Sequence, residues 1–200
     1  MKIGLIVEGT FDGPDKKVCE YLVGRLKQGI DVVTVTLGDK RNLTAKCGET
    51  SALLLRDSCE RVVIVWDLYP PWRRGERPCR HDDKEKIFSS LEQAGVGSEN
   101  VHLVCIREEL EAWLIADNRA LAAALLRLTG REPRITEVRK PDSVSNPKER
   151  LMRIFRQHTH RQYQGHDHAI KIIRELQNFN KIRRSKSFIR FALKATDTAL

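Results

Sequence analysis

The chain lacks the cysteine pattern of a disulfide framework or a structural zinc site. Its five cysteines are an odd number, and no two of them form a Cys-x-x-Cys pair. It also lacks an apolar run of the ~18 residues that a membrane helix needs. Glu8 stands where a signal peptide would have its apolar core. These absences predict a reduced, cytoplasmic protein without a membrane segment.

The Gly-Lys-Ser/Thr ending of a phosphate-binding P-loop is missing too, although Gly9 and Gly13 follow the first apolar run. No internal repeat or low-complexity tract interrupts the sequence. With 200 residues, 40% of them hydrophobic, the chain is long enough for one packed domain or one domain with an appendage.

Charge is distributed unevenly around a net value of +9. Residues 1–117 hold 17 Lys and Arg against 20 Asp and Glu, whereas residues 118–200 hold 19 against 7. An acid-rich part joined to a basic part suits an enzyme that binds metal ions in one place and a polyanion in another. The basic part is equally explained by helices with cationic, solvated faces.

Four apolar, β-branched runs divide the first half of the chain, at residues 3–7, 32–36, 62–66 and 101–106. They are continuous rather than alternating, as in strands that are buried on both faces. The segments between them carry apolar residues at helical spacing, over residues 15–27, 49–59 and 82–94. The alternation predicts an α/β fold with a mostly parallel sheet flanked by helices.

From Glu109 onward the pattern becomes helical. Asp117 or Asn118 is placed to cap a helix, and Pro147 suits the first turn of another. We therefore expect an α/β core over residues 1–115 and a basic helical C-terminal region over residues 116–200, packed on the core.

Acidic residues follow three of the predicted strands: Glu8, Asp67, and Glu108 with Glu109, with Glu111 just inside the next helix. The carboxyl ends of parallel strands lie at one edge of a sheet, where ligands bind. Clustered carboxylates repel unless a cation neutralises them, and oxygen-only clusters suit Mg²⁺ or Mn²⁺. The alternative is that these acids cap helices or lie in solvated loops.

The strand ends "LIVEG" and "VVIVWD", the segment "EELEAWLIAD" and the later Pro147–Lys148 occur in an order that resembles TOPRIM-like proteins. More narrowly, they resemble the short TOPRIM-like family long described as a domain of unknown function and found in anti-phage defence operons. The TOPRIM fold is shared by primases, topoisomerases, ribosomal-RNA maturases and nucleases. The resemblance implies a metal-dependent nuclease, because one member of the short family is a transfer-RNA-cleaving toxin controlled by an ATPase.

The resemblance also implies roles for individual residues. Asp67, Glu109 and Glu111 would bind Mg²⁺, and Glu8 would bind it too or transfer a proton. Lys148 would neutralise charge in the transition state.

One position departs from the family pattern. TOPRIM proteins usually carry Asp-x-Asp at the second motif, whereas here Asp67 is followed by Leu68 and Tyr69. The missing acid leaves open whether the site holds one ion or two.

A basic loop over residues 69–80 is the first candidate for contact with nucleic acid. Arginine forks beside an aromatic ring suit single-stranded or looped RNA, although a solvated loop would have the same composition. The predicted nucleic-acid-binding residues are Trp72, Arg73, Arg74, Arg77, Arg80 and Arg150.

Together these patterns predict a Mg²⁺-dependent nuclease of RNA or DNA that acts in anti-phage defence. The alternative is a degenerate TOPRIM-like module that binds a partner ATPase or nucleic acid without cutting. An ABC-type ATPase partner and a homodimer stay open at this point. So does the role of four histidines: His158, His160, His166 and His168.

Overall fold

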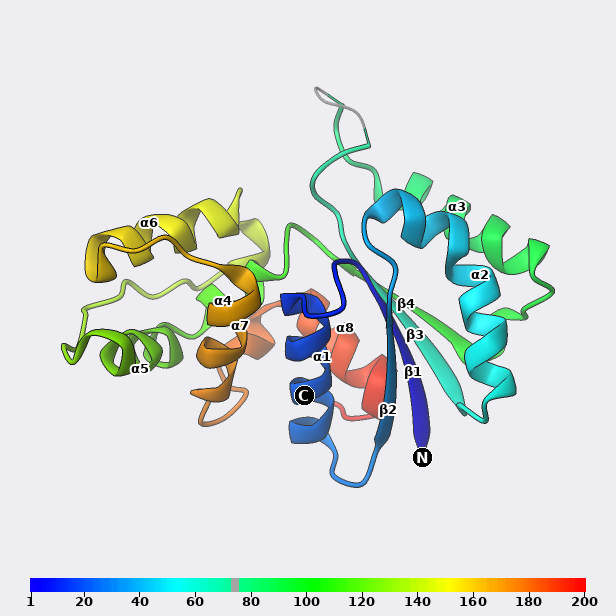
Figure 1. Ribbon diagram of the computed structural model, residues 1–200, viewed down its shortest axis with the longest axis horizontal. Helices are drawn as coiled ribbons and strands as arrows, with labels where there is room; N and C mark the ends of the chain where they lie inside the picture. The colour runs from blue at the N-terminus through cyan, green and yellow to red at the C-terminus, as the bar shows by residue number, and fades with distance from the viewer. Residues whose placement is uncertain (73–75) are drawn as a thin grey trace.

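The computed structural model describes residues 1–72 and 76–200, which build one sheet with helices on both faces (Figure 1). Its strands are β1 (Lys2–Val7), β2 (Asp31–Thr36), β3 (Arg61–Asp67) and β4 (Val101–Ile106). Every pairing is parallel, in the order β2-β1-β3-β4. The predicted α/β class with a mostly parallel sheet is confirmed.

The helices fall into three groups (Figure 1). One face of the sheet carries α2 (Lys40–Arg56) and α3 (Arg80–Gln93), and the other carries α1 (Pro14–Leu26) and α8 (Lys186–Thr196). A side lobe beyond α1 holds α4 (Glu111–Ala116), α5 (Asn118–Thr129), α6 (Pro147–Thr159) and α7 (Gly165–Arg174). None of the helices in the described residues is long and apolar enough to cross a membrane.

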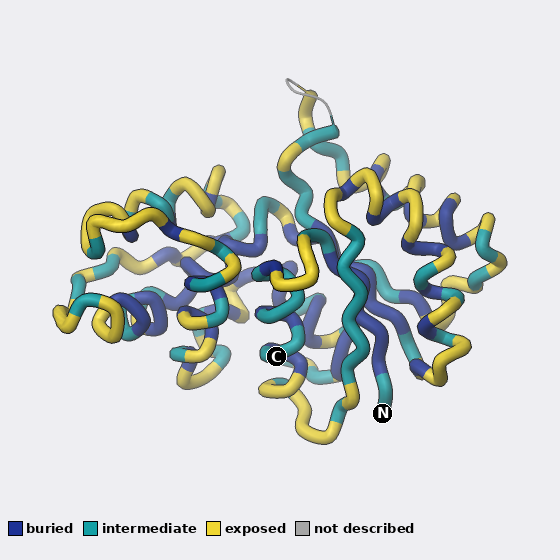
Figure 2. Tube along the Cα trace, in the orientation of Figure 1, coloured by how far each residue is buried: buried dark blue, intermediate teal, exposed yellow. Residues whose placement is uncertain are grey.

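Hydrophobic cores lie on both sides of the sheet, which appears as the buried centre of Figure 2. Val63 and Val65 of β3 face the core beneath α1, whereas Ile64 and Trp66 face α2 and α3. Burial on both faces explains why the strands read as unbroken apolar runs.

The C-terminal helices share the core beneath α1. Trp113 of α4 is fully buried, packs against Phe188 and Phe191 of α8, and donates a hydrogen bond to Ser187 Oγ at 2.9 Å. Helix α8 is therefore packed on the sheet, whereas α5, α6 and α7 lie in the side lobe, and the expected division at residue 115 stays a prediction.

Helix α2 begins nine residues before the predicted start at residue 49, so that prediction was wrong. Asp39 caps the helix by accepting a hydrogen bond from the Asn42 backbone N–H at 2.8 Å. Gly48, which normally weakens a helix, is required because a Cβ atom there would lie 1.9 Å from the Ser90 carbonyl oxygen. Close packing of α2 on α3 overrides the local sequence preference.

Candidate functional site

The strand order places a topological switch point between β1 and β3. The chain leaves β1 to one side to form β2 and returns on the other side to form β3. Ligands of parallel α/β sheets bind at the carboxyl ends of the two strands beside such a point. Glu8 follows β1 and Asp67 ends β3, and the Asp67 backbone N–H donates a hydrogen bond to Glu8 Oε1 at 3.2 Å. The structure thus brings these two predicted residues together.

Asp67 has an unpartnered carboxylate oxygen at this point. Its Oδ1 atom is buried and has no hydrogen-bond partner within the described residues. Burial raises the pKa of Asp67 well above its ordinary value, and the charges of Asp15, Glu8 and Glu111 raise it further. A buried carboxylate oxygen without a donor is costly for the fold and is available to bind a cation.

The pKa values of Glu8 and Asp15 are also strongly raised. Burial raises the pKa of Glu8 to about 8, against the opposing effect of the positive charge of Lys40. Burial likewise raises the pKa of Asp15 to about 6, with Lys148 opposing it. Gly9 has a φ of +95°, and a Cβ atom on it would lie 3.1 Å from Asp15 Oδ2. The glycine turn therefore lets the start of α1 approach the end of β1.

Sequence reasoning missed Asp15. An acid in the first turn of a helix is ordinarily explained by the helix dipole. The sequence held one signal for Asp15: it follows Glu8–Gly9 by only a few residues, so a single tight turn can bring it close to Glu8.

Glu111 is the fourth acid of the site and the most deeply buried of the four. It is 5% exposed, and its Oε1 atom accepts a hydrogen bond from the Tyr163 hydroxyl at 3.3 Å. Burial raises the pKa of Glu111 to about 7, while the positive charge of Lys148 lowers it. We call Glu8, Asp15, Asp67 and Glu111 the carboxylate cluster.

Glu109, which was predicted to bind metal, makes a different contact. Its Oε2 atom accepts a hydrogen bond from the Lys148 backbone N–H at 3.2 Å, in the first turn of α6. Glu109 also raises the pKa of Glu111 through its charge. It therefore lies beside the carboxylate cluster and holds the start of α6, and its role as a metal ligand stays a prediction.

The carboxylate cluster fits Mg²⁺ or Mn²⁺ in the kind of donor it offers, because all of its side-chain donors are oxygen atoms. Across residues 1–72 and 76–200, however, no three Asp, Glu, His or Cys side chains are already arranged to hold a metal ion. A bound cation would have to draw these carboxylates closer together than they lie here.

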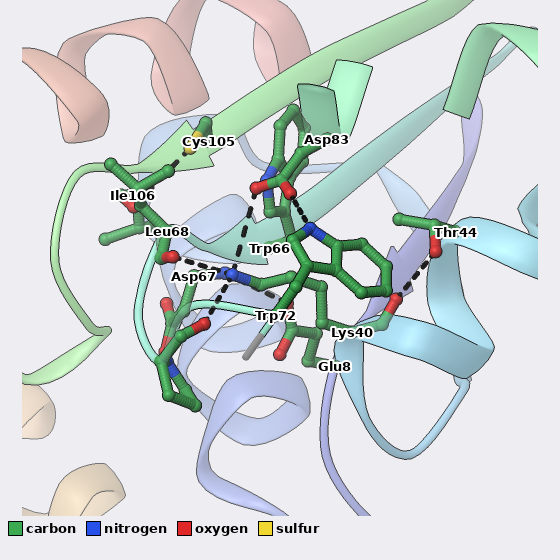
Figure 3. A network of polar contacts seen from close by, with 11 residues as sticks. Glu8, Lys40, Thr44, Trp66, Asp67, Leu68, Trp72, Asp83, Cys105 and Ile106 are labelled. Carbon is green, nitrogen blue, oxygen red and sulfur yellow. Dashed lines mark hydrogen bonds and ion pairs between the residues drawn. The ribbon is translucent and has the colours of Figure 1, made fainter. Parts of the chain in front are cut away.

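A network of polar contacts centred on Lys40 anchors the loop that follows β3 (Figure 3). Lys40 Nζ donates hydrogen bonds to the Leu68 and Pro70 carbonyl oxygens at 2.6 and 2.9 Å. It also lies 3.8 Å from Asp83 Oδ2. The amine therefore ties this loop to α3 and places a positive charge near Glu8.

Trp72 is part of the same network. Its indole N–H donates to Asp83 Oδ1, and the Lys86 ammonium lies 3.4 Å from its ring centroid. Asp83 is fully buried and also accepts a hydrogen bond from Trp66 Nε1 at 3.0 Å. One face of the Trp72 ring is thus already in contact with a cation, and its role in stacking on bases stays a prediction.

The arginines predicted to bind nucleic acid lie in different places. Arg77 and Arg80 are exposed before and at the start of α3, and Arg150 lines a groove of about 510 Å³ beside α6 together with Arg134 and Arg153. Two predicted residues fall outside the described residues: Arg73 and Arg74.

The four histidines form no metal group within the described residues. His168 is buried against Phe155 and Tyr163, and its Nδ1 atom accepts a hydrogen bond from the Gln164 backbone N–H at 2.8 Å. Burial lowers the pKa of His168. This histidine is therefore neutral and part of the packing of the side lobe.

No curated protein matches the chain. Residues 25–194 match a family described as a domain of unknown function, DUF4276. The matched range includes Asp67, Glu109 and Glu111, and it begins after Glu8 and Asp15. Because the match covers most of its length, the chain belongs to the DUF4276 family.

Proposed function

We propose that the chain is a TOPRIM-like, Mg²⁺- or Mn²⁺-dependent nuclease that hydrolyses phosphodiester bonds in RNA or DNA. The observation that carries the proposal is the carboxylate cluster at the β1/β3 switch point, with a buried, unpartnered oxygen on Asp67. The motifs that resemble TOPRIM-like proteins supply the residues of this cluster except Asp15.

The residues of the cluster would divide the chemistry between them. Bound Mg²⁺ would supply Lewis-acid stabilisation of the phosphate oxygens. Asp15, Asp67 and Glu111 would hold it, and Glu8 would either hold it too or transfer a proton. In the metal-free protein the pKa of Glu8 is raised to about 8, and a Glu8 that keeps its proton is suited to protonate a leaving oxygen. Lys148, exposed beside the cluster, would neutralise charge that develops on the phosphate.

Basic residues continue from Lys148 along α6. The groove lined by Arg134, Arg150 and Arg153 starts near the same end of the helix, within a C-terminal region that carries a large excess of positive charge. Phosphate contacts from such residues supply most of the affinity for nucleic acid without selecting a sequence. A strand cut at the carboxylate cluster would thus be held along α6.

In the cell, we propose an effector of anti-phage defence that cleaves transfer RNA in the cytoplasm under the control of an ABC-type ATPase. The second candidate is a module that binds without cutting. It is favoured by the absence of an acid at Leu68 or Tyr69 and by the lack of a ready-made metal group in the described residues.

Cleavage of total transfer RNA and of plasmid DNA, with Mg²⁺ or Mn²⁺, tests the proposal. We expect metal-dependent cutting that falls by on the order of 10²–10⁴-fold in Glu8→Gln, because proton transfer typically contributes this much. The glutamine keeps an oxygen that accepts from the Asp67 amide. Glu49→Gln, at an exposed position of α2, is the control for loss of one carboxylate. No cutting by folded wild-type protein, with an ATPase partner supplied, would favour the binding module.

Reversal of one charge in the groove beside α6 should weaken binding to nucleic acid. We expect Arg153→Glu to lower the affinity for a fluorescent RNA oligonucleotide by about tenfold and to reduce the salt slope of binding by about one. Arg156→Glu makes the same charge change on the same helix but does not line the groove. Equal losses in both variants would show that only the overall charge of the helix matters.

A further inference from the structure

A second basic cavity lies at the carboxyl end of β4, the edge strand of the sheet. It has a volume of about 300 Å³ and is lined by four cationic side chains together with Asp142 and the Cys105 thiol. Cys105 is visible at the end of β4 in Figure 3. The cations come from the start of α3, the end of β4 and the first turns of α8: Arg80, Arg107, Lys186 and Arg190. We call this cavity the four-cation pocket.

None of the four cations forms an ion pair with a described residue. Unpaired arginines are common in the described residues, where only Arg61, Arg127 and Arg184 form ion pairs. Solvated cations on one helix face would need no explanation. Here, however, like charges from three separate parts of the chain converge on one concave pocket.

The acids near the pocket leave its positive charge in excess. Asp142 accepts hydrogen bonds from the backbone N–H groups of Lys186 and Ser187, at 2.8 and 3.3 Å, so its carboxylate is occupied in capping α8. Glu108 is influenced by the charge of Arg107 but does not line the pocket. With four cations and one anion in its wall, the pocket carries a net charge of about +3.

Cys105 forms a neutral, buried wall of the pocket. Cys105 is 4% exposed, and burial raises the pKa of its thiol to about 12. The pocket therefore offers no nucleophile, only a wall behind the arginine side chains. Arginine forks match the oxygens of phosphate groups, and a phosphate monoester carries about −1.5 to −2 at neutral pH.

We propose that the four-cation pocket binds a phosphate monoester, as found on a nucleotide or at the end of a nucleic-acid strand. A phosphodiester within a strand carries a single negative charge and therefore balances the net positive charge of the pocket less well. A volume near the lower end of the range for small-molecule sites suits one nucleotide better than a longer segment. The inference does not depend on the proposed nuclease activity.

Titration calorimetry on the full chain, at low salt and without divalent metal, tests this site. Inorganic phosphate and adenosine 5′-monophosphate should bind saturably, whereas adenosine should not. Arg190→Gln should weaken phosphate binding by about tenfold or more, as expected for loss of a charged hydrogen-bond donor. Arg183→Gln, exposed just before α8 and outside the pocket, should leave it unchanged. If Arg190→Gln does not fold, Lys186→Gln at an exposed position replaces it.

Two further comparisons separate the ligand sources and the competing sites. An oligonucleotide that binds more tightly with a 5′-phosphate than with a 5′-hydroxyl would identify a strand end, and preference for the free nucleotide would identify a small molecule. Lys148→Gln should not affect binding if the carboxylate cluster is uninvolved. The proposal is overturned by no saturable phosphate binding, by equal losses in Arg183→Gln and Arg190→Gln, or by equal binding of adenosine and adenosine 5′-monophosphate.

Discussion

Asp67→Asn is expected to abolish metal-dependent cleavage while making the metal-free protein more stable. The substitution removes a carboxylate that is buried beside three other acids, and burial together with their charges raises its pKa. The asparagine amide can instead donate hydrogen bonds to the neighbouring carboxylates. Relief of even ~1 kcal/mol corresponds to a rise in melting temperature of roughly 2–4 °C for a chain of this size.

Loss of cleavage should be large, because the same carboxylate would bind the metal. Lewis-acid stabilisation is worth several kcal/mol, so loss of a ligand should lower the rate by on the order of 10³-fold. Thermal unfolding in EDTA and cleavage in Mg²⁺ are measured on the same preparations. Asp31→Asn, exposed at the start of β2, is the control for removal of one negative charge. A destabilised but fully active Asp67→Asn protein would show that Asp67 supports the fold and not the chemistry.

The opposing effects follow from how the site is built. A cluster optimised for folding would replace some of these acids with amides or apolar groups. Four buried or half-buried carboxylates at one switch point are therefore the basis for the functional site that we propose. A higher melting temperature of Asp67→Asn would measure how much stability the protein loses by keeping this carboxylate.

Much of this site could be predicted from the sequence because strand ends are easy to locate. Glu8 and Asp67 follow continuous apolar runs, and parallel pairing alone places both at one edge. The sequence could not decide between Glu109 and Glu111, since both precede or begin the same short helix. Packing gives the two acids different contacts: Glu111 turns inward to Tyr163, 52 residues away, whereas Glu109 turns to the start of α6.

Other features depended on contacts that no local pattern encodes. By its sequence position Asp83 is an ordinary first-turn acid of α3, yet it is fully buried and accepts hydrogen bonds from two tryptophans. The four-cation pocket likewise assembles cations that lie up to 110 positions apart, between Arg80 and Arg190. Only the folded chain reveals that these charges converge.

The pH dependence of stability should distinguish the metal-free from the metal-bound cluster. Folding raises the pKa of Glu8 to about 8, of Glu111 to about 7 and of Asp15 to about 6, from ordinary values near 4. Between about pH 4.5 and pH 8 the folded protein thus holds protons that the unfolded chain has released. These three acids therefore make stability in EDTA fall as pH rises through this window.

We expect the melting temperature in EDTA to drop by on the order of 10 °C between pH 5 and pH 8.5. Mg²⁺ should have almost no effect at pH 5, where protons occupy the carboxylates, and should restore stability progressively up to pH 8.5. The surface pair of Asp197 with Arg61 does not interfere, because the lowered pKa of Asp197 affects stability only in more acidic solution. Glu8→Gln should flatten both curves, while Glu49→Gln should leave them unchanged.

Each pattern of the two curves identifies one state of the site. A fall in EDTA that Mg²⁺ reverses means that the carboxylates titrate together and bind the ion once ionised. If the melting temperature falls in the same way but neither Mg²⁺ nor Mn²⁺ restores it, the carboxylate cluster binds another ligand. That result would favour the binding module over the nuclease. A flat curve in EDTA would show that Glu8, Asp15 and Glu111 are better solvated than their burial implies, and would remove the electrostatic argument for the site.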